Sequence, residues 1–122
     1  MGRFSLKPLF AGKLSQKGLF MSSNAEILIL AINQKKQVTG YYDGFYREMC
    51  PHVIGWKGAV HHVLSYQFAG DSSKGLPPGG DWKCMDVDGI SQLALRDGPW
   101  QTGATHGKPQ TCVDRVEAVV NY

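Results

Sequence analysis

The stretch QVTGYYDGFYREM, residues 37–49, decides the fold class. It sets two runs rich in β-branched and aromatic residues on either side of Asp43-Gly44. This dipeptide is a strong hairpin signal, because both central residues of the favoured turn need positive φ. We therefore expect strands at 37–42 and 45–49 joined by a tight turn.

Beyond the hairpin the sequence continues in short extended segments. Pro51 predicts an edge strand or the start of a strand, because proline cannot donate to a ladder. VHHVLSYQF, residues 60–68, is the longest strand candidate and is predicted to be central. Residues 69–81 hold four glycines and two prolines, which predicts an irregular loop of unusual length. Further strands are predicted at 82–87, 90–95 and 111–120.

The segment before the hairpin carries a helix signal. Ser23 and Glu26 have the spacing of a capping box, which predicts a helix from about Asn24 to Asn33. Its apolar run at 27–30 would also suit a buried strand, and the cap favours the helix. The expected fold is therefore mainly β with a short N-terminal helix, in a single domain over residues 22–122.

Length and charge limit the kind of site that this domain can carry. A chain of 122 residues fits one globular domain with one core. Residues 1–21 are basic and acid-free, so we expect a disordered arm, a targeting segment or an extended start there. From residue 21 onward, nine basic residues stand against ten acidic ones. Any anion site must therefore be small and local, since broad nucleic-acid surfaces need clustered Lys and Arg.

The cysteines and the hydropathy pattern bear on location. Cys50, Cys84 and Cys112 are odd in number and widely spaced, which argues against a disulfide framework and favours a reducing, cytoplasmic compartment. The longest apolar run, 27–32, has six residues. A bilayer-spanning helix needs about 20, so no membrane association is expected.

Several motifs occur in an order that resembles the WYL domains of bacterial regulators. Those domains show a tyrosine-bearing strand, an arginine four residues before a proline, a strand with the naming tripeptide, and a closing segment. The matching residues here are Tyr41-Tyr42, Arg47 with Pro51, HHVLSY at 61–66, and KCMDVDGI at 83–90. Order and spacing agree across residues 26–95, most closely with short, free-standing members that lack a helix-turn-helix.

The resemblance implies a small Sm-like or SH3-like β-barrel that serves as a ligand-sensing regulatory module. Nucleotides or single-stranded nucleic acids are the ligands it suggests. This chain has His61-His62-Val63 at the position of the naming tripeptide, and Lys83 and Gly89 where the closing segment has arginines. The residues expected to bind ligand are Tyr42, Arg47, His62, Tyr66, Gln67 and Lys83.

Arg47 is the first candidate for an anion contact. It follows the tyrosine-rich hairpin, and a guanidinium beside Tyr42 and Tyr46 can stack on a base or clamp a phosphate. The alternative is a structural ion pair with Glu48 or Asp43. The sequence leaves both interpretations open.

The other candidates lie farther along the chain. Lys83 is expected to share a pocket with Arg47, whereas Asp88 is expected to be structural, at the turn before Gly89. Tyr66 and Gln67 end the long strand and face the irregular loop, where a base could stack or bond. Alternatively, Tyr66 fills the barrel with its hydroxyl at the rim.

Histidines and cysteines raise a metal hypothesis for Cys50, His52, His61 and His62. Structural zinc sites usually pair their ligands two to four residues apart in two clusters, and this set does not meet that pattern. Adjacent strand residues also point to opposite faces, so only one of His61 and His62 could join the others. We therefore expect neither a metal nor another cofactor.

Catalysis finds little support in the motifs. Cys112 or Ser65 with His62 would supply a nucleophile and a base, yet no nucleophile-elbow, zinc-protease or phosphate-loop motif is present. We expect a binding protein rather than an enzyme. Two alternatives remain, namely a self-associating protein-interaction barrel that docks through an open strand edge and a metal-dependent hydrolase.

Overall fold

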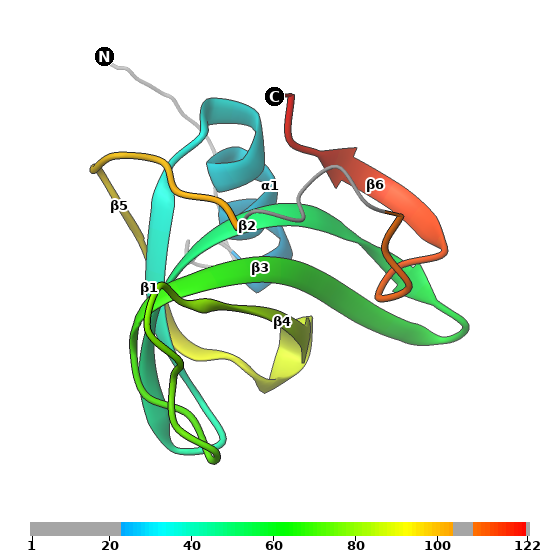
Figure 1. The fold of residues 1–122 in the computed structure, drawn as a ribbon. Helices are drawn as coiled ribbons and strands as arrows, with labels where there is room; N and C mark the ends of the chain where they lie inside the picture. The colour runs from blue at the N-terminus through cyan, green and yellow to red at the C-terminus, as the bar shows by residue number, and fades with distance from the viewer. Residues whose placement is uncertain (1–22, 104–108, 122) are drawn as a thin grey trace.

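The computed structural model describes residues 23–103 and 109–121. The basic segment predicted at 1–21 lies outside them. Within these residues the chain forms one α-helix, one 3-10 helix and six strands, coloured along the chain in Figure 1. In chain order they are α1 (Asn24–Gln34), β1 (Gln37–Tyr42), β2 (Phe45–Lys57), β3 (Val60–Gly70), β4 (Asp81–Asp86), η1 (Val87–Gly89), β5 (Ser91–Arg96) and β6 (Arg115–Val119).

The strands form one antiparallel sheet in the order β4-β3-β2-β1-β5, and β6 pairs with β2 outside this path. Figure 1 shows that the sheet is strongly curved, with β2 and β3 as its longest strands. The prediction of a mainly β fold with a short N-terminal helix is confirmed. Among the described residues, the pairings leave β4 and β5 at the two ends of the path, so a closed barrel remains a prediction.

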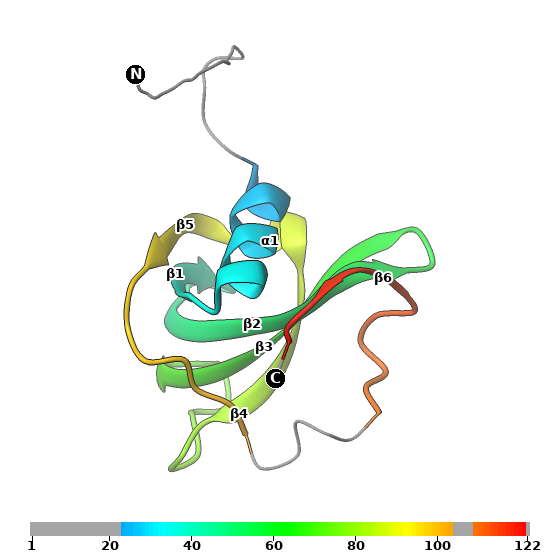
Figure 2. The same ribbon diagram turned by 90° about the horizontal axis from the view of Figure 1, so that it is seen from above.

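The helix begins at the predicted cap. Ser23 Oγ accepts a hydrogen bond from the amide of Glu26, whose carboxylate accepts one from the amide of Ser23. The buried residues of α1, Leu28, Ala31 and Ile32, face the sheet. Figure 2 shows α1 held between β5 on one side and β6 on the other. In the part of the chain that the structure describes, no helix has the length and apolar character needed to cross a membrane.

The hairpin also follows the prediction. Asp43 and Gly44 have φ of 53° and 80°, and the register places Tyr42 opposite Phe45. The central position predicted for the third strand is confirmed, because β3 pairs with β2 on one side and β4 on the other.

The prediction that Pro51 starts a strand is wrong, because β2 runs through it from Phe45 to Lys57, whereas the predicted edge position holds locally on one side of β2. One side of β2 pairs with β1 as far as Met49 and with β6 only from Val53 onward. Pro51 therefore lies where that side of the ladder is interrupted. On the other side of β2, the pairing with β3 has a register shift between Pro51 and Val53, and this irregularity also accommodates the proline in the ladder.

The core lies between α1 and the curved sheet. It contains aliphatic and methionine side chains from the helix and from most strands. Its buried members are Leu28, Ala31, Ile32, Val38, Met49, Ile54, Val63, Met85, Val87, Ile90 and Val120.

The cysteines contradict the expectation of unpaired thiols. Cys84 on β4 and Cys112, just before β6, form a disulfide, and Cys50 is free and buried. The two partners are 28 residues apart in sequence, so local spacing carried no signal of the pairing. The predicted cytoplasmic location rested on unpaired cysteines and loses that support.

Candidate ligand-binding site

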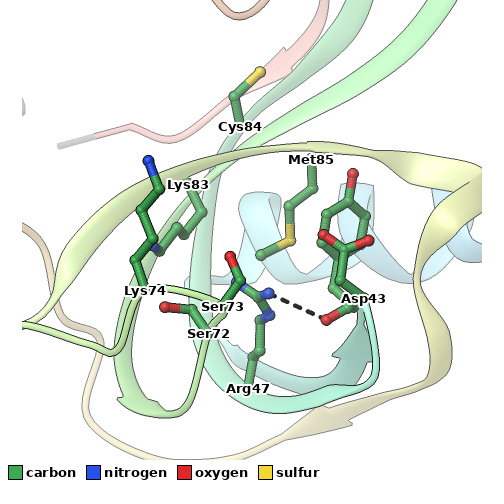
Figure 3. A pocket seen from close by; sticks show the side chains of 9 residues that line it. Asp43, Arg47, Ser72, Ser73, Lys74, Lys83, Cys84 and Met85 are labelled. Carbon is green, nitrogen blue, oxygen red and sulfur yellow. Dashed lines mark hydrogen bonds between the residues drawn. The ribbon is translucent and has the colours of Figure 1, made fainter.

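A hollow of about 190 Å³ lies between the β1–β2 hairpin, β4 and the loop that follows β3. Three cationic side chains from separate elements line it, Arg47 of β2, Lys74 of the loop and Lys83 of β4. Figure 3 shows the Arg47 guanidinium between Ser73 and Asp43. The remaining lining residues are Tyr42, Ser72, Cys84 and Met85.

Arg47 is held firmly at the floor of this pocket. Only 4% of the residue is exposed. Its Nη1 donates to Gln67 Oε1 at 3.2 Å and its Nη2 to the carbonyl of Tyr42 at 3.1 Å. The guanidinium also lies 5.4 Å from the ring centre of Tyr42 and 6.0 Å from that of Phe45, within the range of cation–π attraction.

The acceptors around Arg47 do not neutralise its charge by direct contact. Both hydrogen-bond acceptors named above are uncharged oxygens, and Nε is buried with no partner among the described residues. Burial lowers the pKa of Arg47, while the carboxylates of Asp43 and Asp71 act in the opposite direction. A buried cation of this kind gains from an incoming anion, because the anion replaces lost hydration.

Tyr42 fixes one wall of the site. Its hydroxyl accepts a hydrogen bond from the amide of Asp86 at 3.0 Å, which ties the hairpin to β4. The predicted contact between Arg47 and Tyr46 is wrong, because Tyr46 lies opposite Tyr41 on the other face of the hairpin, with ring centres 5.6 Å apart. Phe45, two residues before Arg47, supplies the second ring.

Gln67 lies behind Arg47 rather than in the pocket wall. It is fully buried, and its Nε2 donates to the carbonyls of Ala69 and Asp71 at 3.1 and 2.9 Å. The amide of Asp71 in turn donates to the carbonyl of Tyr46. Gln67 therefore links Arg47 to the first residues of the loop and is a positioning residue.

Of the two ion pairs considered for Arg47, the one with Glu48 does not form, whereas Asp43 is a charged neighbour whose carboxylate raises the pKa of Arg47. Glu48 pairs with Arg96, whose Nη2 lies 2.6 Å from Glu48 Oε1. Asp43 lines the pocket together with Arg47. Lys83 Nζ lies 3.5 Å from Asp81 Oδ2 with most of the Lys83 side chain covered, so β4 places this second cation beside the loop.

Six lining residues are outside the set predicted from the sequence, and three of them belong to the loop after β3. They are Asp43, Cys84 and Met85, and, in the loop, Ser72, Ser73 and Lys74. For the loop residues the only signal was the unusual length of the loop, which indicated a purpose without naming residues. Ser72 anchors the loop, because its Oγ donates to the carbonyl of Gly75 at 2.8 Å.

His62 and Tyr66 lie on the other face of β3. The β3–β4 register is unbroken, with Ser65 opposite Lys83 and Tyr66 opposite Trp82. Side chains of adjacent strand residues point to opposite faces, and the rings of Tyr66 and Trp82 pack 5.4 Å apart. The structure therefore brings Tyr42, Arg47 and Lys83 together and leaves His62 and Tyr66 away from them.

The zinc set considered from the sequence does not assemble. His52 Nε2 lies 2.9 Å from Thr102 Oγ1, whereas His61 Nε2 lies 2.6 Å from Glu117 Oε1 and its ring stacks on Trp56. The group that does assemble in the described residues is His62, Cys84 and Cys112.

The nucleophile considered from the sequence is also contradicted. Cys112 is in a disulfide, so it is not a free thiol. Ser65 is three residues from His62 on β3, which places the two side chains on opposite faces of the strand.

Comparisons with known proteins identified no similar protein. No family model matches the chain, and neither the curated proteins nor the solved structures gave a match. The fold and site define a small, mainly β domain with a cationic pocket. The likeness to WYL domains continues to rest on the sequence motifs alone.

Proposed function

We propose that this protein is a ligand-sensing regulatory module of the WYL type that binds a nucleotide, or the end of a single nucleic-acid strand, through a phosphate group. The observation that supports this function is the convergence of Arg47, Lys74 and Lys83 on one small hollow. A cytoplasmic location, where nucleotides are abundant, is part of the proposal.

The size of the hollow favours a partly exposed ligand. Pockets that enclose drug-sized molecules have volumes of about 300–1,000 Å³, whereas this one has about 190 Å³. It has room for a phosphate with part of the adjoining sugar. The base of a nucleotide, or the rest of a strand, would extend into solvent.

Asp43 gives the pocket a second kind of recognition. Its carboxylate lies across Arg47 from Lys74 and Lys83, as Figure 3 shows. A carboxylate accepts hydrogen bonds from hydroxyls and amines and repels further negative charge. The arrangement therefore favours a ligand with one phosphate and a nearby donor, such as a sugar hydroxyl or a base amine, over a polyanion.

The small number of cations also predicts weak salt dependence. Binding to single strands falls with salt by a slope of about −0.7 for each phosphate that is neutralised. A pocket for one phosphate therefore predicts a slope of about −0.7 rather than the steep slopes of extended nucleic-acid surfaces. This expectation agrees with the near balance of charge from residue 21 onward.

The test is fluorescence titration with labelled nucleoside monophosphates, cyclic nucleotides and 5′-phosphorylated oligonucleotides. We expect Arg47→Ala and Lys83→Ala each to weaken binding by about 1–3 kcal/mol, the range for a lost charge-assisted hydrogen bond. Arg115→Ala on β6 is the matched control, because it removes the same charge outside the pocket.

Lys74→Ala and Lys83→Ala keep the test valid if Arg47→Ala does not fold. Lys74 lies in a loop and neither lysine belongs to the core, so both variants are expected to fold. If both variants bind nucleotide as tightly as the unchanged protein, the proposal fails. A stable oligomer by light scattering together with no nucleotide binding would instead favour the interaction module.

A further inference from the structure

We propose a second site, a zinc site that exists only in the reduced protein and is formed by His62, Cys84 and Cys112. It lies on the face of β3 and β4 opposite the Lys83 side chain, and Cys84 is the one residue that also borders the pocket. The proposal does not rest on nucleotide binding, and its test is separate.

The sheet register brings two of the three ligands together. His62 pairs with Asp86 and Leu64 pairs with Cys84 across β3 and β4, so His62 and Cys84 are diagonal neighbours on one face. Cys112 reaches the same place from the segment before β6. One potential ligand atom from each residue lies within 4.8 Å of the others.

The separation between His62 and Cys84 already suits a metal ion. Cys84 Sγ lies 3.6 Å from His62 Nδ1. Tetrahedral zinc with a Zn–N bond of 2.0–2.1 Å and a Zn–S bond of about 2.3 Å requires an N···S separation of roughly 3.6 Å. Nδ1 also lies 2.8 Å from the carbonyl of Cys112, a contact that it exchanges for the metal.

Asp86 supplies the outer partner that metal-binding histidines typically have. Its Oδ1 lies 3.0 Å from His62 Nε2. In the zinc-bound form Nε2 donates to this carboxylate, and Nδ1, freed of its hydrogen bond to the Cys112 carbonyl, directs its lone pair to the metal. This carboxylate–histidine arrangement orients the ring and raises its basicity as a ligand, so Asp86 is a positioning residue for the site.

The site stays assembled when the disulfide is opened, because other contacts hold Cys112 in place. The amide of Asp114 donates to the carbonyl of Trp56 at 2.9 Å. The amide of Val113 donates to Gln110 Oε1 at 2.8 Å. Cys112 and Val113 are buried against Val53, so their position does not depend on the covalent bond.

The oxidised and zinc-bound states are connected by two steps, reduction of the disulfide and binding of the metal. A dithiol reductant transfers two electrons and two protons to the disulfide, which gives two thiols and leaves the reductant as its own disulfide. Zinc then displaces the two thiol protons and the proton through which His62 Nδ1 contacts the carbonyl of Cys112, and the released protons pass to solvent. Two Zn–S bonds and one Zn–N bond form in their place. Two thiolates neutralise the charge of the ion, so the reduced site carries no net charge beyond that of Asp86.

Zinc is the metal that this donor set favours. Two thiolates and one imidazole are typical zinc ligands, whereas magnesium and calcium take oxygen donors. Cys84 is exposed, so the ion can enter from solvent. Three protein ligands leave a fourth position for water or a small anion.

The experiment uses the full chain, either oxidised or reduced by a dithiol and then freed of reductant without air. Zinc is titrated in competition with a chromophoric chelator. We expect one zinc per reduced chain and no stoichiometric binding by the oxidised form. Cobalt in place of zinc should produce the thiolate-to-cobalt charge-transfer absorption, which reports sulfur ligation directly.

Variants assign the ligands. His62→Ala and Cys84→Ser should each weaken zinc binding by more than about tenfold, and Asp86→Asn by about 10–100-fold, as for other outer-partner changes. His61→Ala is the matched control, because this neighbouring histidine contacts Glu117 instead. Circular dichroism verifies that each variant is folded.

The proposal is overturned if the reduced protein binds no zinc, or if His62→Ala and Cys84→Ser bind it as tightly as the unchanged protein. Should the variants fail to fold, the cobalt spectrum of the unchanged protein still decides, since absence of the charge-transfer band excludes thiolate ligation. Loss of nucleotide binding alone leaves these results unaffected.

Discussion

Gly55 provides a sharp test of how β6 packs on β2. It lies opposite Val116 in the β2–β6 ladder. A Cβ added at Gly55 would lie 2.0 Å from the carbonyl oxygen of Arg115 and 2.6 Å from Val113 Cγ1. One obstacle is backbone, so β6 has to move by about 1 Å to restore a 3.0 Å contact, and the ladder between the strands weakens.

We expect Gly55→Ala to lower the free energy of unfolding by about 1–3 kcal/mol, the usual cost of overpacking. For a domain of this size, each kcal/mol corresponds to a fall in Tm of about 4–8 °C. This net loss includes an opposing contribution. Alanine lowers the conformational entropy of the unfolded chain, which stabilises a protein by about 0.4–1 kcal/mol at positions where alanine fits without strain.

Thermal unfolding by circular dichroism and urea denaturation measure the change, and hydrogen exchange at the β6 amides locates it. Gly89→Ala is the control, since its closest obstacle is the edge of the Tyr42 side chain at 3.0 Å rather than backbone. The same substitution there should cost much less. Equal stabilities for the two variants would show that β6 does not pack on Gly55 as described.

Three further predictions concern other parts of the fold. Leu28→Ala removes a fully buried side chain of α1 and should cost about 2–5 kcal/mol in urea denaturation; a neutral result would show that the helix does not pack on the sheet. The hydrogen bond with His61 lowers the pKa of Glu117 below its ordinary 4.5, so its stabilisation is present above that pH and is lost as the pH falls through the lowered value. Glu117→Gln should remove this part of the pH dependence of Tm, and an unchanged acid profile would refute it. Burial raises the pKa of the Cys50 thiol, so mass spectrometry should find Cys50 unalkylated in the native protein at neutral pH and alkylated after unfolding, whereas rapid native labelling would contradict its burial.

The local elements of the fold were predictable from the sequence because their signals are local. Ser23 and Glu26 cap the helix within one turn, and Asp43-Gly44 sets the hairpin through its own backbone angles. Strand alternation and turn residues then located β3 and β4 to within a residue or two. In each case the deciding interaction joins residues a few positions apart.

The errors concern contacts between distant segments. The continuation of β2 through Pro51 depends on where β1 stops and β6 starts, which no local pattern contains. The pairing of Cys84 with Cys112 depends on how the segment before β6 returns to β4.

In the candidate site, too, the residues with local sequence signals were predicted and those placed by distant contacts were not. Arg47 and Lys83 were identified from motif positions and line one pocket, whereas Lys74 comes from an irregular loop whose path is set by bonds such as that of Gln67 to Asp71. His62 was assigned to that pocket although strand alternation places it on the other face.

The arrangement of β2 bears on how the chain folds as it is synthesised. All strands up to Arg96 leave the ribosome before β6 does, so the five-stranded path can form while one side of β2 near Val53 and Ile54 still lacks its partner. Unpaired strand edges invite pairing with other chains. Synthesis of β6 therefore covers an aggregation-prone strand edge, and products truncated before Arg115 should precipitate more readily than chains that contain β6.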